Sequence, residues 1–467
     1  MEQIAEAVFG ANGEVTESTG LRPGILSPME TLAQSISTIA PTTSPTMTIP
    51  LVFALAGNGT WLAYLFATCT VLLIAFTISR FARHTSCSGS LYTYATSSLP
   101  AGVSNIAGWA LLLAYMATGA SVAGGFINYA NVFLLEFTHH AAPNWLLAVL
   151  CMAGSTFIAY RDVQVSARLM LWIEAISVAL IAIVLVILLW KNGLHFDHAQ
   201  THLQGVTPSG VRLGVVLALF SFVGFESATT LGHEAVNPLR TIPRAVIQSA
   251  IAAGLFFIVC AYMETLGMAA VHQNLGTSTA PLSVLATLAG VSRFGTLIDF
   301  GALVSMFACT LACTTAAARV LMRMAHNGLV HNRLSKAHAK NATPSSAVVL
   351  IGVVTTLPVA ILAARGVSGT EIYGWLGSLS VYGFITTYGL AAAALPRYLK
   401  QNHELNAGTL ALSIAAILAM LLAMAGTLYP VPTERPYNWL PYLYLAYILC
   451  GVAWYFIATA RRPHVAS

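Results

Sequence analysis

Charged side chains are scarce in this sequence of 467 residues, since Asp, Glu, Lys and Arg together make up 8% of it. Soluble domains carry roughly 25%, because a surface that faces water needs them. Hydrophobic residues reach 57%, and the mean hydropathy is +0.75. The deficit of charge argues against a soluble protein of this size and predicts an integral membrane protein, with the lipid bilayer as its first partner.

Patterns that would indicate other classes of protein are missing as well. The net charge of +5 is spread too thinly for a nucleic-acid surface. Six of the seven cysteines lie inside apolar runs, so we expect neither a disulfide framework nor a metal site. Neither a nucleotide-binding loop nor a paired set of catalytic residues occurs, so we expect no enzyme and no cofactor.

Twelve apolar segments follow a polar start. Residues 1–27 have no basic beginning and no early apolar core, so we expect a cytoplasmic tail rather than a signal peptide. The segments lie roughly at 29–56, 60–80, 101–135, 144–160, 166–190, 210–232, 246–270, 293–323, 345–364, 371–395, 407–429 and 439–460. Each is long enough, or nearly so, to cross a hydrocarbon layer of about 30 Å.

The basic residues orient these twelve segments. With the N-terminus inside, 16 of the 21 Lys and Arg residues fall on the inner side and 5 on the outer side. The positive-inside rule therefore predicts a multi-pass protein of the cell (inner) membrane with both termini cytoplasmic, the second being the tail 461–467.

The sixth segment is interrupted at its centre. Ser221 and Gly224 stand in the middle of an apolar helix, and Glu226 follows where a membrane helix is deep. Glycine inside a helix costs about 1 kcal/mol, and a carboxylate at bilayer depth costs at least roughly 2.5 kcal/mol on insertion scales. This combination is typical of a broken membrane helix around a binding site.

The first segment is interrupted too. Pro41 and Pro45 each remove a helix hydrogen bond within an otherwise apolar run. A kinked but continuous helix is the alternative. Because segments one and six occupy corresponding places, the pair indicates an inverted-repeat transporter. The domain 28–460 then divides into a first repeat at about 28–190, a second at about 210–395 and two additional C-terminal helices at about 407–460.

Four short motifs carry a resemblance to a known family. They are Phe220–Ser227 (Phe-Ser-Phe-Val-Gly-Phe-Glu-Ser), Asn237–Arg244, Ser88–Tyr94 and Arg319–Gly328. In this order and spacing they resemble the amino acid–polyamine–organocation (APC) superfamily, including its bacterial amino acid permeases and antiporters. The resemblance implies an all-α polytopic membrane protein with the LeuT-like 5+5 inverted repeat and a secondary transporter of amino acids.

Two positions depart from the family pattern. The first break in the family usually reads Gly-Ser/Ala-Gly-Ile or similar, whereas Pro41-Thr42-Thr43-Ser44 stands here. Some members carry a lysine in segment five that titrates beside the break, and Ser177 occupies that place. The substrate and the coupling ion are therefore not set by the resemblance.

The two breaks suggest how a free amino acid is bound. The N–H groups of Thr42, Thr43 and Ser44, at the positive end of a half-helix, suit a carboxylate. Carbonyls freed near Ser221 suit an ammonium group, and Phe220 stands where the resemblance puts an aromatic gate. The predicted substrate-binding set is Ile39, Pro41, Thr42, Thr43, Ser44, Phe220, Ser221, Phe222, Gly224 and Phe225, although Phe222 and Phe225 also suit plain packing.

Energy coupling has several candidates. Glu174 or Glu226 is able to carry a proton, but Glu226 suits equally a structural role that ties down the break. Na⁺ bound by Ser177 with Thr310 and Thr314 is the alternative, and simple helix packing by small residues is another. Because Ser177 cannot ionise, we favour proton coupling or plain exchange.

Rival functions stay open at the level of sequence. A polyamine or other amine would use Glu226 and Glu264 as counter-charges and need no carboxylate cradle. An amino acid exchanger and a nutrient receptor both suit the same fold. The amino acid and the oligomeric state are not determined by the sequence.

Overall fold

The computed structural model describes residues 21, 23–85, 88–161, 164–191, 197–338, 343–429 and 435–460. Most of the N-terminal tail predicted at 1–27 and all of the tail at 461–467 lie outside the described residues. Within them the chain is helical, apart from loops and one isolated parallel β-bridge between Leu26 and Ala235. This confirms a helical protein, as the apolar runs predict.

The helices follow one another with short connections. The first half contains α2 (Pro28–Ile39), η1 (Ser44–Thr48), α3 (Ile49–Ala56), η2 (Gly57–Gly59), α4 (Thr60–Ala82), α5 (Ser90–Thr96), α6 (Ala101–Thr138), α7 (Asn144–Arg161) and α8 (Gln164–Lys191). The second half contains α9 (His198–Thr201), α10 (Pro208–Phe220), η3 (Ser227–Leu231), α11 (Pro238–Ala270), η4 (Leu275–Thr277), α12 (Pro281–Ala289), α13 (Ser292–His326), η5 (Asn332–Ser335), α14 (Ser345–Ala364), α15 (Gly369–Gln401), α16 (Ala407–Leu428) and α17 (Leu440–Ala460).

Many of these helices are long and apolar enough to cross a membrane. Among the described residues, nine stretches qualify by length and hydropathy, of which the first, Pro28–Ala82, joins α2 through α4. The apolar helix α10 is shorter, and α7 is not one of the nine. A multi-pass membrane protein is therefore confirmed, while the number of twelve crossings stays a prediction.

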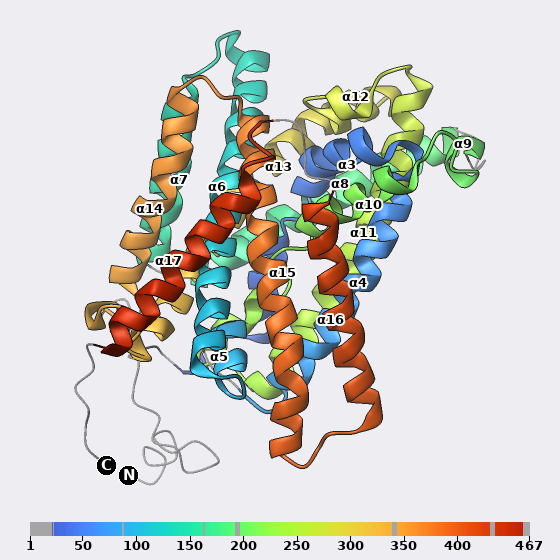
Figure 1. The fold of residues 1–467 in the computed structure, drawn as a ribbon. Coiled ribbons are helices and arrows are strands. Elements are labelled where there is room, and N and C mark those ends of the chain that lie inside the picture. Colours follow the sequence, from blue (N-terminus) through green and yellow to red (C-terminus); the bar gives the residue numbers. More distant parts are fainter. Residues whose placement is uncertain are drawn as a thin grey trace.

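The helices form one bundle with two distinct ends (Figure 1). We call the end that carries α12 the α12 end and the opposite one, with the short α5, the α5 end. In the middle, α6 and α15 approach closely through glycine: a Cβ at Gly124 would lie 2.7 Å from the carbonyl oxygen of Gly369, and one at Gly383 would lie 2.5 Å from that of Ala110. The helices α7 and α14 pack side by side at one flank.

The first membrane segment is broken rather than only kinked. The helix α2 ends at Ile39, and Ala40 takes a left-handed conformation with φ of 48°. The chain resumes as the π-helical turn η1, with Pro45 in its first turn, and continues into α3. Proline is tolerated there because the first turn of a helix lacks partners for its N–H groups.

The sixth segment is broken as well. The helix α10 ends at Phe220, turns occupy the next six residues, and the 3₁₀-helix η3 follows. Gly224 has a φ of +87°, a conformation that is strained for residues with a Cβ. Both predicted interruptions are thus present in the structure.

Candidate functional site

The two breaks lie against each other. Ser35 on α2 donates from its hydroxyl to the carbonyl of Phe225 at 2.7 Å and accepts from the N–H of Ala228 at 3.1 Å. The hydroxyls of Thr38 and Ser227 share a hydrogen bond of 2.8 Å. These contacts satisfy polar groups that the interrupted helices leave free, so the two breaks stabilise one another.

Glycine makes this approach possible. A Cβ added at Gly224 would collide with the side chain of Thr38, lying 2.7 Å from its Cβ and closer still to its methyl group. Gly224 is therefore needed for contact between the two breaks.

Glu174 holds the first break from the side of α8. One carboxylate oxygen accepts from the N–H of Thr42 at 2.7 Å and from its hydroxyl at 2.8 Å. The N–H of Thr43 donates to the carbonyl of Ala40 at 2.8 Å. The expectation that the N–H groups of both threonines are free for a ligand is therefore wrong, because an internal carboxylate and a tight turn already use them.

Other groups of the first break keep their capacity for a ligand. The hydroxyl of Thr43 is buried and has no hydrogen-bond partner among the described residues. Ser44 is buried at the start of η1. A carboxylate ligand would bind to these groups rather than to the complete set of N–H groups of Thr42, Thr43 and Ser44 that the sequence suggests.

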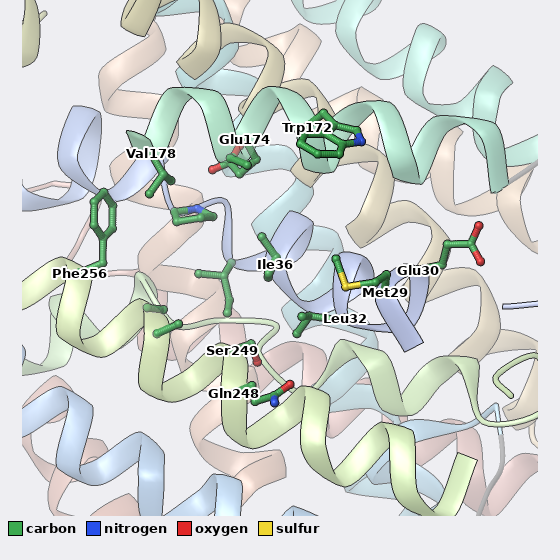
Figure 2. A pocket seen from close by; sticks show the side chains of 15 residues that line it. Met29, Glu30, Leu32, Ile36, Trp172, Glu174, Val178, Gln248, Ser249 and Phe256 are labelled. Atoms are coloured by element: carbon green, nitrogen blue, oxygen red, sulfur yellow. The ribbon is translucent and has the colours of Figure 1, made fainter. Parts of the chain in front are cut away.

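A hollow of about 770 Å³ opens beside Glu174, between α2, α8 and α11 (Figure 2). Its walls are mostly apolar; Ile39 and Pro41 line it together with Glu174. Figure 2 shows Glu174 and Val178 on the α8 wall and Phe256 and Ser249 on the α11 wall. Two members of the predicted substrate set thus lie on the flank that faces α8 and α11.

Phe220, at the end of α10, packs against α15. Its ring meets the ring of Tyr373 edge-on, with centroids 5.4 Å apart, and Gly377 leaves room for it, since a Cβ there would lie 2.7 Å from the ring. The hydroxyl of Tyr373 shares a hydrogen bond of 2.7 Å with that of Thr48 in η1. Phe220 therefore joins α10 to α15 and η1, a place that suits a gate.

Phe222 and Phe225 are packed between helices. Phe222 lies edge-on to Phe257 of α11 at 5.3 Å, and Phe225 lies 5.5 Å from Tyr388 of α15. Both side chains are buried. This arrangement corresponds to the packing alternative weighed for them.

Glu226 bridges two helices. Tyr115 of α6 donates to one carboxylate oxygen at 2.8 Å, and Tyr388 of α15 donates to the other at 2.6 Å. The fully buried acid thus has a donor for each oxygen, which suits the role of tying down the break. The tyrosines stand 111 and 162 residues away in sequence and belong to no motif, so sequence reasoning missed them.

The structure does not assemble the predicted Na⁺ ligands. The hydroxyl of Ser177 donates to the carbonyl of Ile173 at 2.9 Å, and Ser177 packs against Gly301 of α13. Thr310 lies nine residues beyond Gly301 on α13, which is about 13 Å along the helix axis at 1.5 Å per residue. It donates to the carbonyl of Met306 at 3.0 Å, and Thr314 donates to that of Thr310 at 2.9 Å. Ser177 and Thr310 therefore form separate helix contacts.

A buried ion pair closes the α5 end. Arg319 of α13 donates from Nε and Nη2 to the two carboxylate oxygens of Glu234, each at 2.9 Å. Their side chains are 1% and 7% exposed. Sequence alone does not reveal this pairing, because Arg319 and Glu234 lie 85 residues apart.

Backbone contacts complete this closure. The N–H of Leu26 donates to the carbonyl of Glu234, and that of Val236 donates to Leu26, both at 2.8 Å. Burial, and secondly Arg323, lower the pKa of His233 from its usual 6.5. No group of three or more potential metal ligands occurs in the part of the chain that the structure describes.

An all-helical, multi-pass bundle with two adjoining broken helices is the architecture of a membrane transporter. The sequence profile of the amino acid permease family matches residues 26–454, so the chain belongs to this family and, with it, to the APC superfamily. The resemblance of the four motifs is thereby confirmed.

Characterised relatives carry several kinds of solute. The chain is 27% identical to a branched-chain amino acid permease of Bacillus subtilis, over 65% of this chain and 67% of the relative. It is 24% identical to a methylthioribose transporter of the same species, over 75% and 76%. It is also 25% identical to a low-affinity putrescine importer of Escherichia coli, over 64% and 66%. The chain is accordingly a transporter of small molecules, and such permeases are generally not enzymes.

Proposed function

We propose that this protein is a secondary transporter that carries amino acids across the cell membrane by alternating access. The observation that carries the proposal is the pair of helix breaks, joined by hydrogen bonds from Ser35 and Thr38 to the second break. Discontinuous helices of this kind present backbone groups to solute and ion near the middle of the bilayer.

The bound amino acid would lie between the breaks. Thr43 and Ser44 would meet its carboxylate, since the Thr43 hydroxyl is buried without a partner among the described residues. The carbonyls of Ala218, Leu219 and Phe220 already accept from the N–H groups of the next turn, so the ammonium group of the amino acid would meet carbonyls of that turn, such as that of Ser221. Phe220 would cover the solute from the α15 side, where it already meets Tyr373.

An amine without a carboxylate is the second candidate. Glu174 already accepts from Thr42, which leaves less of the predicted cradle for a substrate carboxylate. The chain is also similar to a putrescine importer. A diamine needs negative partners instead, and buried acids supply them.

The architecture we propose is the 5+5 inverted repeat with twelve crossings. The first repeat takes about 28–190, the second about 210–395, and α16 and α17 are additional. In this arrangement the α5 end faces the cytoplasm, in agreement with the excess of basic residues predicted on that side.

Coupling is assigned to Glu174, because its carboxylate touches the first break directly through Thr42. Protonation would weaken these hydrogen bonds and so link proton binding to the shape of the break. Uptake by proteoliposomes with Na⁺ replaced by choline should persist, and a pH gradient should drive it. Glu174→Gln should abolish the response to the gradient. Loss of uptake in choline, without any response to pH, would contradict proton coupling.

The substrate class is tested by a thermal-unfolding screen of the purified protein against the twenty amino acids and putrescine. A ligand at 100 times its Kd stabilises by about 2.7 kcal/mol, which is easily measured. A stabilising amino acid should also accumulate in proteoliposomes. Stabilisation by putrescine alone would favour the amine, and binding without uptake would indicate a receptor.

A further inference from the structure

A basic pocket of about 380 Å³ lies where the end of α4 meets the first turns of α11. Arg83, just after α4, and Arg240 and Arg244 on α11 line it, and all three residues are exposed. The ion pairs that the described residues form belong to Arg319 and His84, and none of the three arginines has a side-chain partner among these residues. No acidic residue lines the pocket in the described part of the chain, so its positive charge is not balanced there.

This basic pocket adjoins the hollow beside the first break. Gln248 lines both, and Figure 2 shows it on the α11 wall of the hollow. Residues four apart are neighbours on a helix surface, and such a row joins the two spaces: Arg240, Arg244, Gln248, Ala252 and Phe256. From Arg240 to Phe256 the row covers about 24 Å of α11. Its members change from charged to polar to apolar with distance from the start of the helix.

The hollow is open to the surroundings of the bundle. Met29 and Trp172 line it and are 65% and 70% exposed, and in a membrane protein such apolar surface faces lipid. Along α2 the hollow extends from Met29 to Ile39, a distance of about 15 Å. This is half of a hydrocarbon layer of about 30 Å. The hollow therefore matches the hydrocarbon of one leaflet in both chemistry and depth.

We propose that the basic pocket and the hollow together bind one anionic phospholipid, with its phosphate in the pocket and an acyl chain in the hollow. Arginine suits phosphate because its guanidinium group donates two parallel hydrogen bonds to phosphate oxygens. Gln248 stands at the junction, where its amide is able to donate to the ester carbonyls of the lipid. The far end of the chain would reach Pro41 and Glu174 at the first break. The inference goes beyond the proposed function, since it concerns a lipid ligand whichever solute is carried.

The experiment measures the unfolding temperature of the purified full chain in detergent as phosphatidylglycerol is added. Phosphatidylcholine with the same acyl chains tests the need for net negative charge, and glycerol 3-phosphate at constant ionic strength tests the phosphate without a chain. The double variant Arg240→Gln with Arg244→Gln removes two charges from the pocket. The matched control, Arg333→Gln with Lys336→Gln, removes two charges from exposed residues that follow α13 and do not line the pocket.

The unfolding temperature should rise with phosphatidylglycerol in the unaltered protein and in the control variant. In Arg240→Gln with Arg244→Gln, the lipid concentration that gives half of this rise should increase at least about tenfold, because a hydrogen bond to a charged group contributes about that factor or more. Ala252→Phe adds a ring to the wall of the hollow and should weaken the effect of the lipid several-fold, which gives a second readout if the double variant does not fold.

Three results would overturn the lipid site. They are the absence of a rise with phosphatidylglycerol, an equal rise with phosphatidylcholine or with glycerol 3-phosphate, and a rise that the double variant at Arg240 and Arg244 retains in full. An equal rise with glycerol 3-phosphate would identify a site for a free phosphate instead. Solute uptake is not part of this experiment, so a failure of the proposed transport function would leave its result unchanged.

Discussion

Gly224 is the residue on which contact between the two breaks depends most directly. Gly224→Ala should abolish uptake, because the new Cβ would enter the side chain of Thr38 and force α2 away from the second break. The residue would also be strained by its φ of +87°. Uptake and the unfolding temperature of the purified variant are the measurements, and Gly224→Leu should abolish uptake as well.

A matched control separates the collision from the backbone strain. Gly366, between α14 and α15, has a similar φ of +83° with nothing within 4 Å of the position its Cβ would take. Gly366→Ala should therefore keep most of the uptake rate. Equal rates in the two variants would show that close approach to Thr38 is unimportant.

A second prediction at the scale of residues concerns the aromatic ring of Phe220. Phe220→Ala should raise the KM for uptake or lower the maximal rate, because it removes the ring that meets Tyr373 and covers the proposed solute. Phe222→Ala is the comparison: its ring packs against Phe257, so it should lower stability, by about 3–5 kcal/mol for a buried phenylalanine, more than it alters KM. An unchanged KM and maximal rate in Phe220→Ala would leave it a packing residue only.

Sequence reasoning found the unusual residues but not their partners. Gly224 and Glu226 stand out because each is costly inside an apolar helix, and the structure gives both a specific use. Tyr115 and Tyr388, by contrast, look like ordinary aromatic residues of membrane helices. The role of Glu174 against Thr42 was also missed, because the register of α8 against the first break is a property of packing.

At the scale of elements, the ion pair between Arg319 and Glu234 holds α13 to the segment that follows η3. Arg319→Met should destabilise the protein by about 3–5 kcal/mol, because it leaves Glu234 buried without its counter-charge. The double variant Arg319→Met with Glu234→Leu should regain most of this loss. Chemical or thermal unfolding in detergent measures both.

An exposed pair provides the control for this experiment. His84 and Glu404 lie 3.1 Å apart, with side chains 29% and 53% exposed. Glu404→Gln should change stability by no more than about 1 kcal/mol, since exposed pairs contribute little. If the double variant at Arg319 and Glu234 is no more stable than Arg319→Met, the destabilisation does not come from an unpaired charge.

Apolar periodicity located the long helices well. The predicted segment 345–364 coincides with α14 (Ser345–Ala364), and 144–160 falls one residue short of α7. The short helices α5 and α12 were not predicted as elements, since a run of seven or nine residues carries too little periodicity to be distinguished. The twelve-segment count and the internal repeat remain predictions about how these helices cross the bilayer.

For the whole molecule, the β-bridge between Leu26 and Ala235 closes the α5 end. Under alternating access this end must open, so Leu26→Cys with Ala235→Cys should block uptake when oxidised and recover it on reduction. Cys69 and Cys450, the exposed cysteines among the described residues, and Cys87, which lies outside them, would first be replaced by serine. The single-cysteine variants should transport normally under both conditions. Normal uptake by the fully cross-linked protein would mean that the α5 end need not open at this bridge.

The contact of Glu226 with Tyr115 and Tyr388 also constrains how this protein is able to evolve. A lineage that loses one tyrosine keeps a buried acid short of a donor, and a lineage that first loses the acid keeps two buried hydroxyls that have lost their acceptor. Every single step away from the trio therefore passes through a weakened ancestor. The three residues are therefore expected to change together during evolution. Descendants that lose the acid are expected to lose both hydroxyls as well.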